Sequence, residues 1–252
     1  MLKYDVLNFL DAHGIRSGGY IASNLGVSRT AVWKAINELI ADGFLIEKSK
    51  NGYLLSEQNT PVFENQLKRI LEGFDVHFFD ELPSTNLTAK ALAENGANEK
   101  TVVLALKQTA GRGRLSRKFY SPLGGAFLSA ILNPSLSPES TVLITTAASV
   151  AAARAIEQFT EKKAQIKWVN DIYINSKKVC GILTEGAFNA ETQSLSYAVL
   201  GIGFNLFGDK DLLPDDIKNT ADFIFDTTPS SIKFCEFLKH FLNEFFEIYR
   251  QI

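Results

Sequence analysis

Residues 25–55 read LGVSRTAVWKAINELIADGFLIEKSKNGYLL, and their pattern changes once, from helical spacing to strand spacing. Ser28 offers an N-cap hydroxyl to a helix whose apolar residues recur with the helical period, at Ala31, Val32, Ala35, Ile36, Leu39 and Ile40. An Asp-Gly pair ends that helix. A hairpin should follow, with strands at residues 44–47 and 53–55 joined by a Lys-Asn-Gly turn.

Two shorter helical patterns precede this stretch, at residues 3–12 and residues 20–25, and each ends at a glycine. Three short helices followed by a hairpin form the layout of a winged helix-turn-helix, whose third helix lies in the major groove of DNA. The outer face of that helix supplies the candidate DNA-binding residues Arg29, Thr30, Trp33, Lys34 and Asn37.

The charge of this segment leaves a second interpretation open. Residues 1–60 hold six Lys or Arg and six Asp or Glu, so a small helical domain that binds protein or only packs remains possible. Trp33 could equally be a core aromatic. In favour of DNA, Arg29 and Lys34 share one helix face, and Lys48 and Lys50 lie at the hairpin tip.

Composition bounds the rest of the chain. With 252 residues and 46% hydrophobic residues a packed core is expected, and a net charge of −2 argues against a chain built wholly to bind a polyanion. Two distant cysteines exclude a disulfide framework and a cysteine metal site. Neither a signal peptide nor an unbroken membrane span is found. We therefore expect a soluble, cytoplasmic protein with no membrane partner.

A polar segment at residues 57–61 ends in proline and is typical of a linker. We predict a winged helix-turn-helix at residues 1–58, a linker at 59–64 and a second domain at 65–252. Strands are expected there at 76–79, 101–107, 126–132, 164–168, 172–174, 179–187 and 197–205, and helices at 86–95, 143–159 and 232–252. This alternation predicts an α+β domain with a mixed sheet and helices on one side.

Residues 108–118, QTAGRGRLSRK, carry the strongest chemical signal. Residues 101–138 contain no acidic residue and five positive ones: Lys107, Arg112, Arg114, Arg117 and Lys118. Glycines let the backbone approach a ligand, and guanidinium groups bind carboxylate or phosphate oxygens in bidentate fashion. The segment predicts an anion site, although its spacing fits neither a P-loop nor a dinucleotide fold. A basic loop that touches nucleic acid is the alternative.

Three further motifs are weaker when taken singly. Lys167 begins KWVND, where a lysine could stabilise developing charge or simply be a surface residue. Ser84-Thr85-Asn86 carries polar groups at a helix start, for which N-capping is a sufficient explanation. The strand end GIGFN, residues 201–205, has glycines that let another backbone or a flat ring lie close.

Taken in order with KVCGIL at residues 178–183, these motifs resemble those of biotin–protein ligases. The resemblance covers essentially the whole chain. With the winged helix in front, it extends to the bifunctional ligases that also repress biotin genes. Lipoate ligases share the catalytic fold, but the GRGR loop and the KWxND turn favour biotin. Phe119 and Val169 depart from the family, which usually has Trp and Pro there, and the small β-barrel domain that usually follows is not expected after residue 252.

The resemblance implies a two-step acyl transfer, in which biotin and ATP form biotinyl-5′-adenylate and a lysine of biotin carboxyl carrier protein, of the acetyl-CoA carboxylase type, then takes the biotinyl group. It implies catalytic roles for Lys167, Arg112 and Arg114. Biotin head-group contacts fall to Ser84, Thr85, Asn86 and Gln108, loop contacts to Gly111 and Gly113, and adenylate contacts to Asn170 and Asn205. Mg²⁺ is expected with ATP, although no carboxylate cluster identifies its ligands.

A regulatory hypothesis follows from the two domains. The adenylate would order the basic loop, residues 208–220 would close over the adenine, and the chain would form a homodimer that binds operator DNA more tightly. Two alternatives stay open. One is a ligand-sensing transcriptional regulator without ligase turnover, and the other is a monofunctional ligase with no DNA role.

Overall fold

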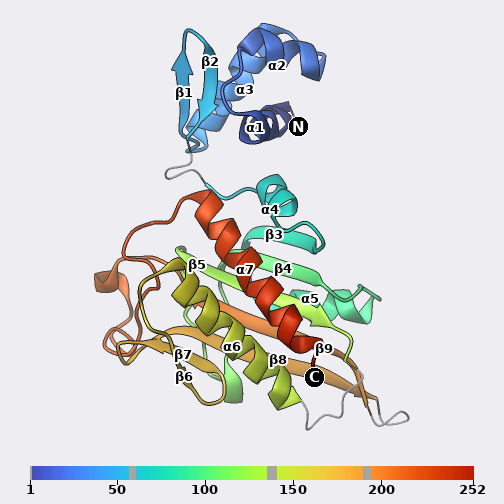
Figure 1. Ribbon diagram of the computed structural model, residues 1–252, viewed down its shortest axis with the longest axis vertical. Helices are drawn as coiled ribbons and strands as arrows, with labels where there is room; N and C mark the ends of the chain where they lie inside the picture. The colour runs from blue at the N-terminus through green and yellow to red at the C-terminus, as the bar shows by residue number, and fades with distance from the viewer. Residues whose placement is uncertain (1, 57–60, 135–140, 190–193) are drawn as a thin grey trace. The chain divides into compact units, whose positions relative to one another are not determined.

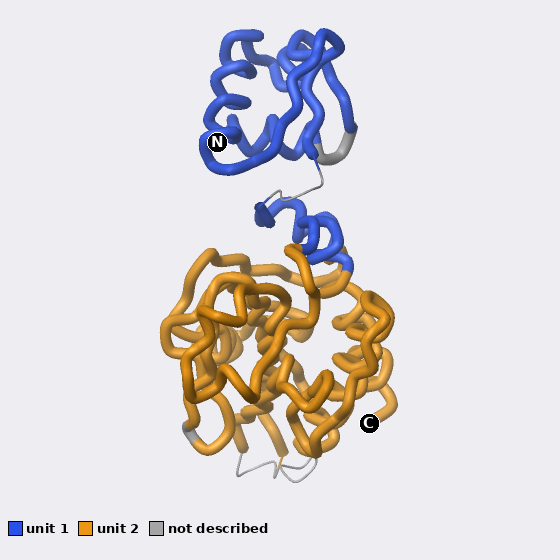
Figure 2. The backbone as a smooth tube through the Cα atoms, turned by 90° about the vertical axis from the view of Figure 1, so that its left-hand side faces the viewer, with its two compact units in different colours: residues 1–70, 229–236 blue, residues 71–228, 237–252 orange. Residues whose placement is uncertain are grey.

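The computed structural model describes residues 2–56, 61–134, 141–189 and 194–252 (Figure 1). The chain forms two compact units (Figure 2): unit 1 comprises residues 1–70 and 229–236, and unit 2 comprises residues 71–228 and 237–252. This division differs from the predicted one, because residues 65–70 and 229–236 group with the N-terminal unit. Of the predicted linker, residues 59 and 60 lie outside the described residues.

Unit 1 contains the winged helix-turn-helix that the sequence predicts. Helices α1 (Leu2–His13), α2 (Gly18–Leu25) and α3 (Arg29–Ala41) are followed by an antiparallel hairpin of β1 (Ile46–Ser49) and β2 (Gly52–Leu55). The Ser28 hydroxyl caps α3 by accepting a hydrogen bond from the Ala31 amide at 3.1 Å. Gly26 ends α2 in the left-handed conformation, at φ 66°.

A fourth helix, α4 (Glu64–Ile70), was not predicted from the sequence. Its Gln66 side chain is buried and donates a hydrogen bond from Nε2 to the Ser231 hydroxyl at 3.1 Å. Ser231 begins the last helix, α7 (Ser231–Tyr249), so this polar contact joins two segments far apart in the sequence within unit 1.

Unit 2 is built on a seven-stranded sheet with the strand order β3-β4-β5-β9-β8-β7-β6. Only β3 and β4 run parallel, and the other neighbours are antiparallel, so the predicted mixed sheet is confirmed. The strands are β3 (Asp75–Leu82), β4 (Thr101–Gln108), β5 (Gly125–Leu132), β6 (Gln165–Lys167), β7 (Asp171–Ile174), β8 (Lys177–Asn189) and β9 (Ser194–Asn205). The helices are α5 (Thr85–Glu94) and α6 (Thr141–Phe159), with most of α7.

The helices cover both faces of the sheet, so the expectation of helices on one side was wrong. Phe204 of β9 packs against Phe237 and Phe241 of α7, with ring centroids 5.0 and 5.2 Å apart. Val199 of β9, five residues earlier, contacts Ala89 of α5. Because side chains alternate between the faces of a strand, α5 and α7 lie on opposite faces.

Helix α6 shares the face of α7. Thr184 of β8 lies opposite Leu200, which has the same parity as Phe204, and its hydroxyl bonds Thr145 of α6 at 2.8 Å. Among the helices that the structure describes, α5 alone contacts the other face, where glycines of β8 and β9 lie against the side chains of Phe119 and Asn86. Within the described ranges, no helix is both long and apolar enough to cross a membrane.

The phenylalanine stripe of α7 should dominate the stability of unit 2. Phe241 is fully buried. We expect Phe241→Ala to lower the free energy of unfolding by about 3–5 kcal/mol, through lost burial and the cavity left behind. Phe188→Ala is the matched control, since this ring is half exposed, and it should cost less than about 1 kcal/mol. Chemical denaturation followed by circular dichroism measures both, and equal losses would contradict this account of the core.

Candidate active site

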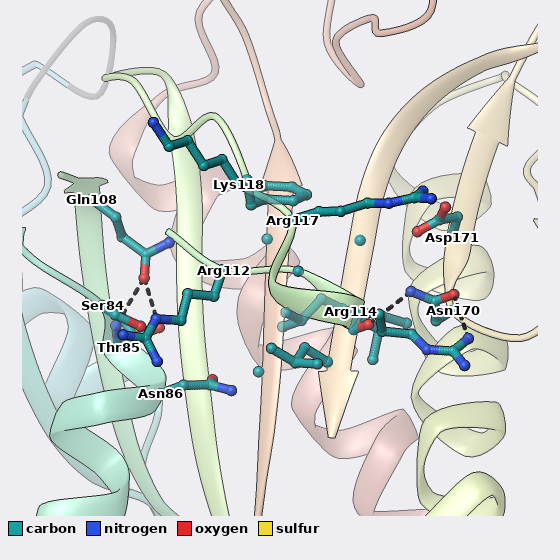
Figure 3. A pocket seen from close by; sticks show the side chains of 18 of the residues that line it. Ser84, Thr85, Asn86, Gln108, Arg112, Arg114, Arg117, Lys118, Asn170 and Asp171 are labelled. Atoms are coloured by element: carbon teal, nitrogen blue, oxygen red, sulfur yellow. Dashed lines mark hydrogen bonds between the residues drawn. The ribbon is translucent and has the colours of Figure 1, made fainter. Parts of the chain in front are cut away.

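A cavity of about 320 Å³ lies on the face of the sheet that carries α5, over the glycines of β8 and β9. Several predicted site residues line it together: Ser84, Thr85, Asn86, Gln108, Arg112, Gly113, Arg114 and Asn170. In Figure 3, Ser84, Thr85, Asn86 and Gln108 gather on one side, and Arg114, Arg117, Asn170 and Asp171 gather on the other. The cavity is large enough to take a small molecule.

The backbone of three glycines, Gly181, Gly201 and Gly203, forms the floor of this cavity. A Cβ atom at Gly203 would stand 2.6 Å from the Phe119 ring, and one at Gly181 would stand 2.7 Å from it. A Cβ atom at Gly201 would stand 2.0 Å from Oδ1 of Asn86. The expected close approach of a flat ring to this strand is therefore confirmed, and the ring belongs to Phe119 at the end of the basic loop.

The first side of the cavity holds a network of hydrogen bonds between uncharged side chains, with the Arg112 side chain beside it (Figure 3). Gln108 accepts at Oε1 from the Thr85 amide at 2.8 Å and donates from Nε2 to the Ser121 hydroxyl at 3.1 Å. Behind them, the Ser129 hydroxyl lies 2.6 Å from Asn86 Oδ1. Ser84 stands at the N-cap position of α5, but its side chain makes no capping bond. Capping alone does not explain this polar triplet.

Glu185 of β8 lies behind this network. Its carboxylate accepts hydrogen bonds from Asn86 Nδ2 at 2.7 Å and from Lys90 Nζ at 2.6 Å. Burial by itself would raise the pKa of Glu185, but the bonds from Lys90 and Asn86 and the charge of Arg112 bring it below its usual value. The carboxylate is therefore ionised at neutral pH.

Arg114 and Arg117 lie on the second side of the cavity (Figure 3), and Lys118 and Lys178 also contribute to the lining. The loop that carries the first three folds back on itself, because the Gly113 amide donates to the Arg117 carbonyl at 2.7 Å. Arg114 donates from Nη1 to Asn170 Oδ1 at 3.3 Å. The loop cations and the distant Lys178 line one cavity, which suits a ligand with several anionic oxygens.

Three predicted site residues do not line the cavity. Lys167 lies on the edge strand β6, with its ammonium 5.3 Å from the centre of the Tyr173 ring. Asn205 donates from Nδ2 to the Asp222 carbonyl at 3.3 Å, a contact that holds the end of β9. Gly111 packs beneath the loop, where a Cβ atom would stand 2.5 Å from the Phe119 carbonyl oxygen.

Lys178 is the lysine that the structure brings into the cavity. Its ammonium lies 2.6 Å from Oδ1 of Asp171 and 5.5 Å from the centre of the Phe119 ring. In the sequence this residue begins the KVCGIL motif, but the sequence alone predicted no role for it. Only the strand order could separate it from Lys167, since β8 lies next to the central strand β9 and β6 lies at the edge of the sheet.

Magnesium does not fit a site made by the protein alone. Among the described residues, no group of three or more His, Cys, Asp or Glu side chains could hold a metal ion. Asp171, the carboxylate of the cavity lining, is engaged by Lys178. We assign no metal ligands and no chemical step to magnesium.

Unit 1 presents its predicted DNA-binding residues on one exposed face of α3. Arg29, Thr30 and Trp33 line a hollow with Gly19 and Tyr53, and Trp33 is 53% exposed, so it is not a core aromatic. A Cβ atom at Gly19 would stand 2.7 Å from Nη2 of Arg29, so the guanidinium lies directly against α2.

The remaining two predicted residues of α3 differ in their surroundings. Lys34 is exposed. Asn37 instead accepts at Oδ1 from Lys48 Nζ of β1 at 2.7 Å, which ties the helix to the hairpin.

Comparisons with known proteins agree with both units. Residues 3–54 match the model of an HTH domain. The chain is 39% identical to the bifunctional ligase/repressor BirA of Bacillus subtilis, over 99% of this chain and 78% of that protein. BirA of Escherichia coli is 29% identical over 75% of this chain and 59% of that protein.

The fold is also similar to that of solved biotin protein ligase structures. Biotin protein ligase from Aquifex aeolicus, in complex with biotin and ATP, superposes with a TM-score of 0.58 at 30% identity, over 70% of this chain and 71% of that one. The model of the biotin/lipoate A/B protein ligase family matches residues 78–205, which contain the strands and loop that build the cavity. The chain belongs to the biotin/lipoate A/B protein ligase family.

Proposed function

We propose that this protein is an ATP-dependent biotin–protein ligase and a biotin-responsive transcriptional repressor. The observation that carries the ligase assignment is the cavity that joins a network of uncharged donors and acceptors to a set of cations, Arg112 beside the network and Arg114 and Arg117 opposite it. Biotin has a neutral end and an anionic end in the same way: its ureido ring is uncharged, and its carboxylate must approach the phosphates of ATP. Both relatives named BirA support the assignment.

In the first step, a carboxylate oxygen of biotin attacks the α-phosphorus of ATP, and the bond to the bridging oxygen of pyrophosphate breaks. Two anions must approach each other, and negative charge grows on the phosphoryl oxygens. Arg112 and Arg114 would neutralise these oxygens as bidentate donors. Lys178 would exchange its partner Asp171 for an oxygen of the forming acyl phosphate. In this proposal it takes the role first expected of Lys167.

In the second step, the neutral amine of a carrier lysine attacks the acyl carbon. The carbon–oxygen bond to AMP breaks, and the amine loses a proton as the amide forms. The carrier would be biotin carboxyl carrier protein of the acetyl-CoA carboxylase type. Cys180 and Cys235 are buried and form no disulfide, which supports a reducing compartment such as the cytoplasm.

The ligase proposal is tested by biotin-dependent exchange of labelled pyrophosphate into ATP. We expect exchange with biotin and none with lipoate. Replacing Lys178 by Met should lower kcat/KM for exchange roughly 100-fold, the order seen when one donor to a developing oxyanion is lost. Replacing Lys167 by Met is the matched control and should leave exchange nearly unchanged, since its ammonium lies by Tyr173.

Each other result has a distinct meaning. If wild-type protein exchanges with lipoate instead, the substrate is wrong. If it exchanges with neither acid but binds biotin, the chain is a ligand sensor without turnover. If Lys167→Met is the damaging variant, the catalytic lysine is the one first predicted from the sequence.

The repressor proposal rests on the exposed face of α3 in unit 1. We further propose that the adenylate promotes a homodimer that binds operator DNA. Replacing Lys34 by Ala should remove one phosphate contact and reduce the slope of log K against log salt by about 0.9. Replacing the exposed Lys239 of α7 by Ala is the control and should leave the slope unchanged.

Fluorescence anisotropy on a duplex from the control region of the biotin genes measures this slope, with and without biotin plus ATP. Tighter binding with both ligands would support the coupling. DNA binding that ignores both ligands would contradict the repressor mechanism, and no DNA binding at all would leave a ligase alone.

A further inference from the structure

The Glu185 carboxylate lies behind the cavity and does not line it. Its side chain is 29% exposed, and both of its partners, Asn86 and Lys90, come from α5. Asn86 itself is buried and does line the cavity. Glu185 can therefore affect a ligand through the Asn86 amide, to which it is hydrogen-bonded, and through its charge on Arg112, which also lines the cavity.

An ionised carboxylate can only accept hydrogen bonds. Asn86 must therefore turn its NH₂ group towards Glu185 and its Oδ1 atom towards Ser129, 2.6 Å away. The Ser129 hydroxyl has a single proton, which this contact uses. The Thr85 hydroxyl lies 2.8 Å from the Ser129 hydroxyl, and it donates to Gln108 Oε1 at 3.2 Å. One carboxylate thus fixes the direction of two successive hydrogen bonds, from Asn86 to Glu185 and from Ser129 to Asn86.

We propose that Glu185 is a positioning residue, which sets the atom of the Asn86 amide that donates and the atom that accepts towards the ureido ring of biotin. This inference rests on the proposed function. A ureido ring carries N–H donors and a carbonyl acceptor in fixed places, so a site of the same shape with reversed polarity would bind it poorly.

The glycine floor restricts how the Asn86 amide can respond. A Cβ atom at Gly201 would stand only 2.0 Å from Oδ1 of Asn86, so the amide fills the space above that backbone. Turning the amide over exchanges its oxygen and nitrogen at nearly constant shape. A reversed amide is thus the accessible alternative, and it would reverse the bond to Ser129.

Lys90 turns this idea into a sharp test. In Glu185→Gln, the side chain keeps its shape but has one oxygen and one NH₂ group. Lys90 carries only donors, so it would take the glutamine oxygen and leave the NH₂ group facing Asn86. The Asn86 amide would then turn over. Adding Lys90→Met removes that demand, and the glutamine oxygen can face Asn86 again.

Isothermal titration of the full chain with biotin, and separately with ATP, tests the proposal. We expect Glu185→Gln to raise Kd for biotin roughly 10- to 100-fold, the range for a hydrogen-bonding arrangement lost beside a charged group, with Kd for ATP unchanged. The double variant with Lys90→Met should recover most of the affinity, although it lacks the ion pair entirely.

Two single variants complete the comparison, and both should bind biotin within a few-fold of wild type. Lys90→Met keeps the carboxylate that orients Asn86. Glu244→Gln is the matched control, because the Glu244 side chain is 30% exposed and its carboxylate pairs with Arg154 Nη1 at a distance of 2.9 Å. Neither residue lines the cavity. Melting temperatures report any general loss of structure.

The outcomes separate the possible explanations. A double variant as weak as Glu185→Gln would mean that only an ion pair was lost, and it would overturn the proposal. Unchanged biotin affinity in Glu185→Gln would overturn it too, while the proposed function stands. Wild-type protein that binds no biotin would overturn both.

Discussion

The Phe119 ring, packed on the bare backbone of Gly181 and Gly203, is the contact on which the site depends. It anchors the end of the arginine loop to the two longest strands of the sheet, and its other neighbours include the Phe127 ring and the Lys178 ammonium. Any side chain at either glycine would lift the ring from the sheet. The arginine loop, the glycine floor and Lys178 all contact this ring, so its displacement would move them relative to one another. The three sequence motifs therefore meet at one contact.

Much of this could be predicted from the sequence because local patterns determine it. Ser28 and Gly26 set helix ends through their own backbone and side-chain chemistry, and the helical period identified α3 and α7. Arginines alternating with glycines indicated an anion site without any tertiary information. Helix α4 escaped prediction because it is only seven residues long and its buried Gln66 depends on Ser231, which is 165 residues away.

The misplaced features share one cause, which is that they depend on strand order. Lys167 and Lys178 look equivalent along the chain, since each lies in a predicted strand region next to a motif of the site. Strand order puts β6 at the edge of the sheet and β8 beside β9, and of these two lysines Lys178 lines the cavity. The placement of α5 and α7 on opposite faces of the sheet has the same cause. It follows from which residues of β9 each helix contacts, Val199 for α5 and Phe204 for α7, and the local sequence does not indicate these contacts.

The two sides of the cavity differ because different segments cover the sheet there, α5 on one side and the arginine loop on the other. Where α5 covers the sheet, the polar side chains satisfy one another, and the ionised Glu185 accepts hydrogen bonds from Lys90 and Asn86. Where the arginine loop covers the sheet, cations line the cavity, and Arg114 and Lys178 are held by Asn170 and Asp171. A ligand with a neutral head and an anionic end meets each environment in turn. The selectivity of the site therefore originates in the coverage of the sheet, and the individual side chains refine it.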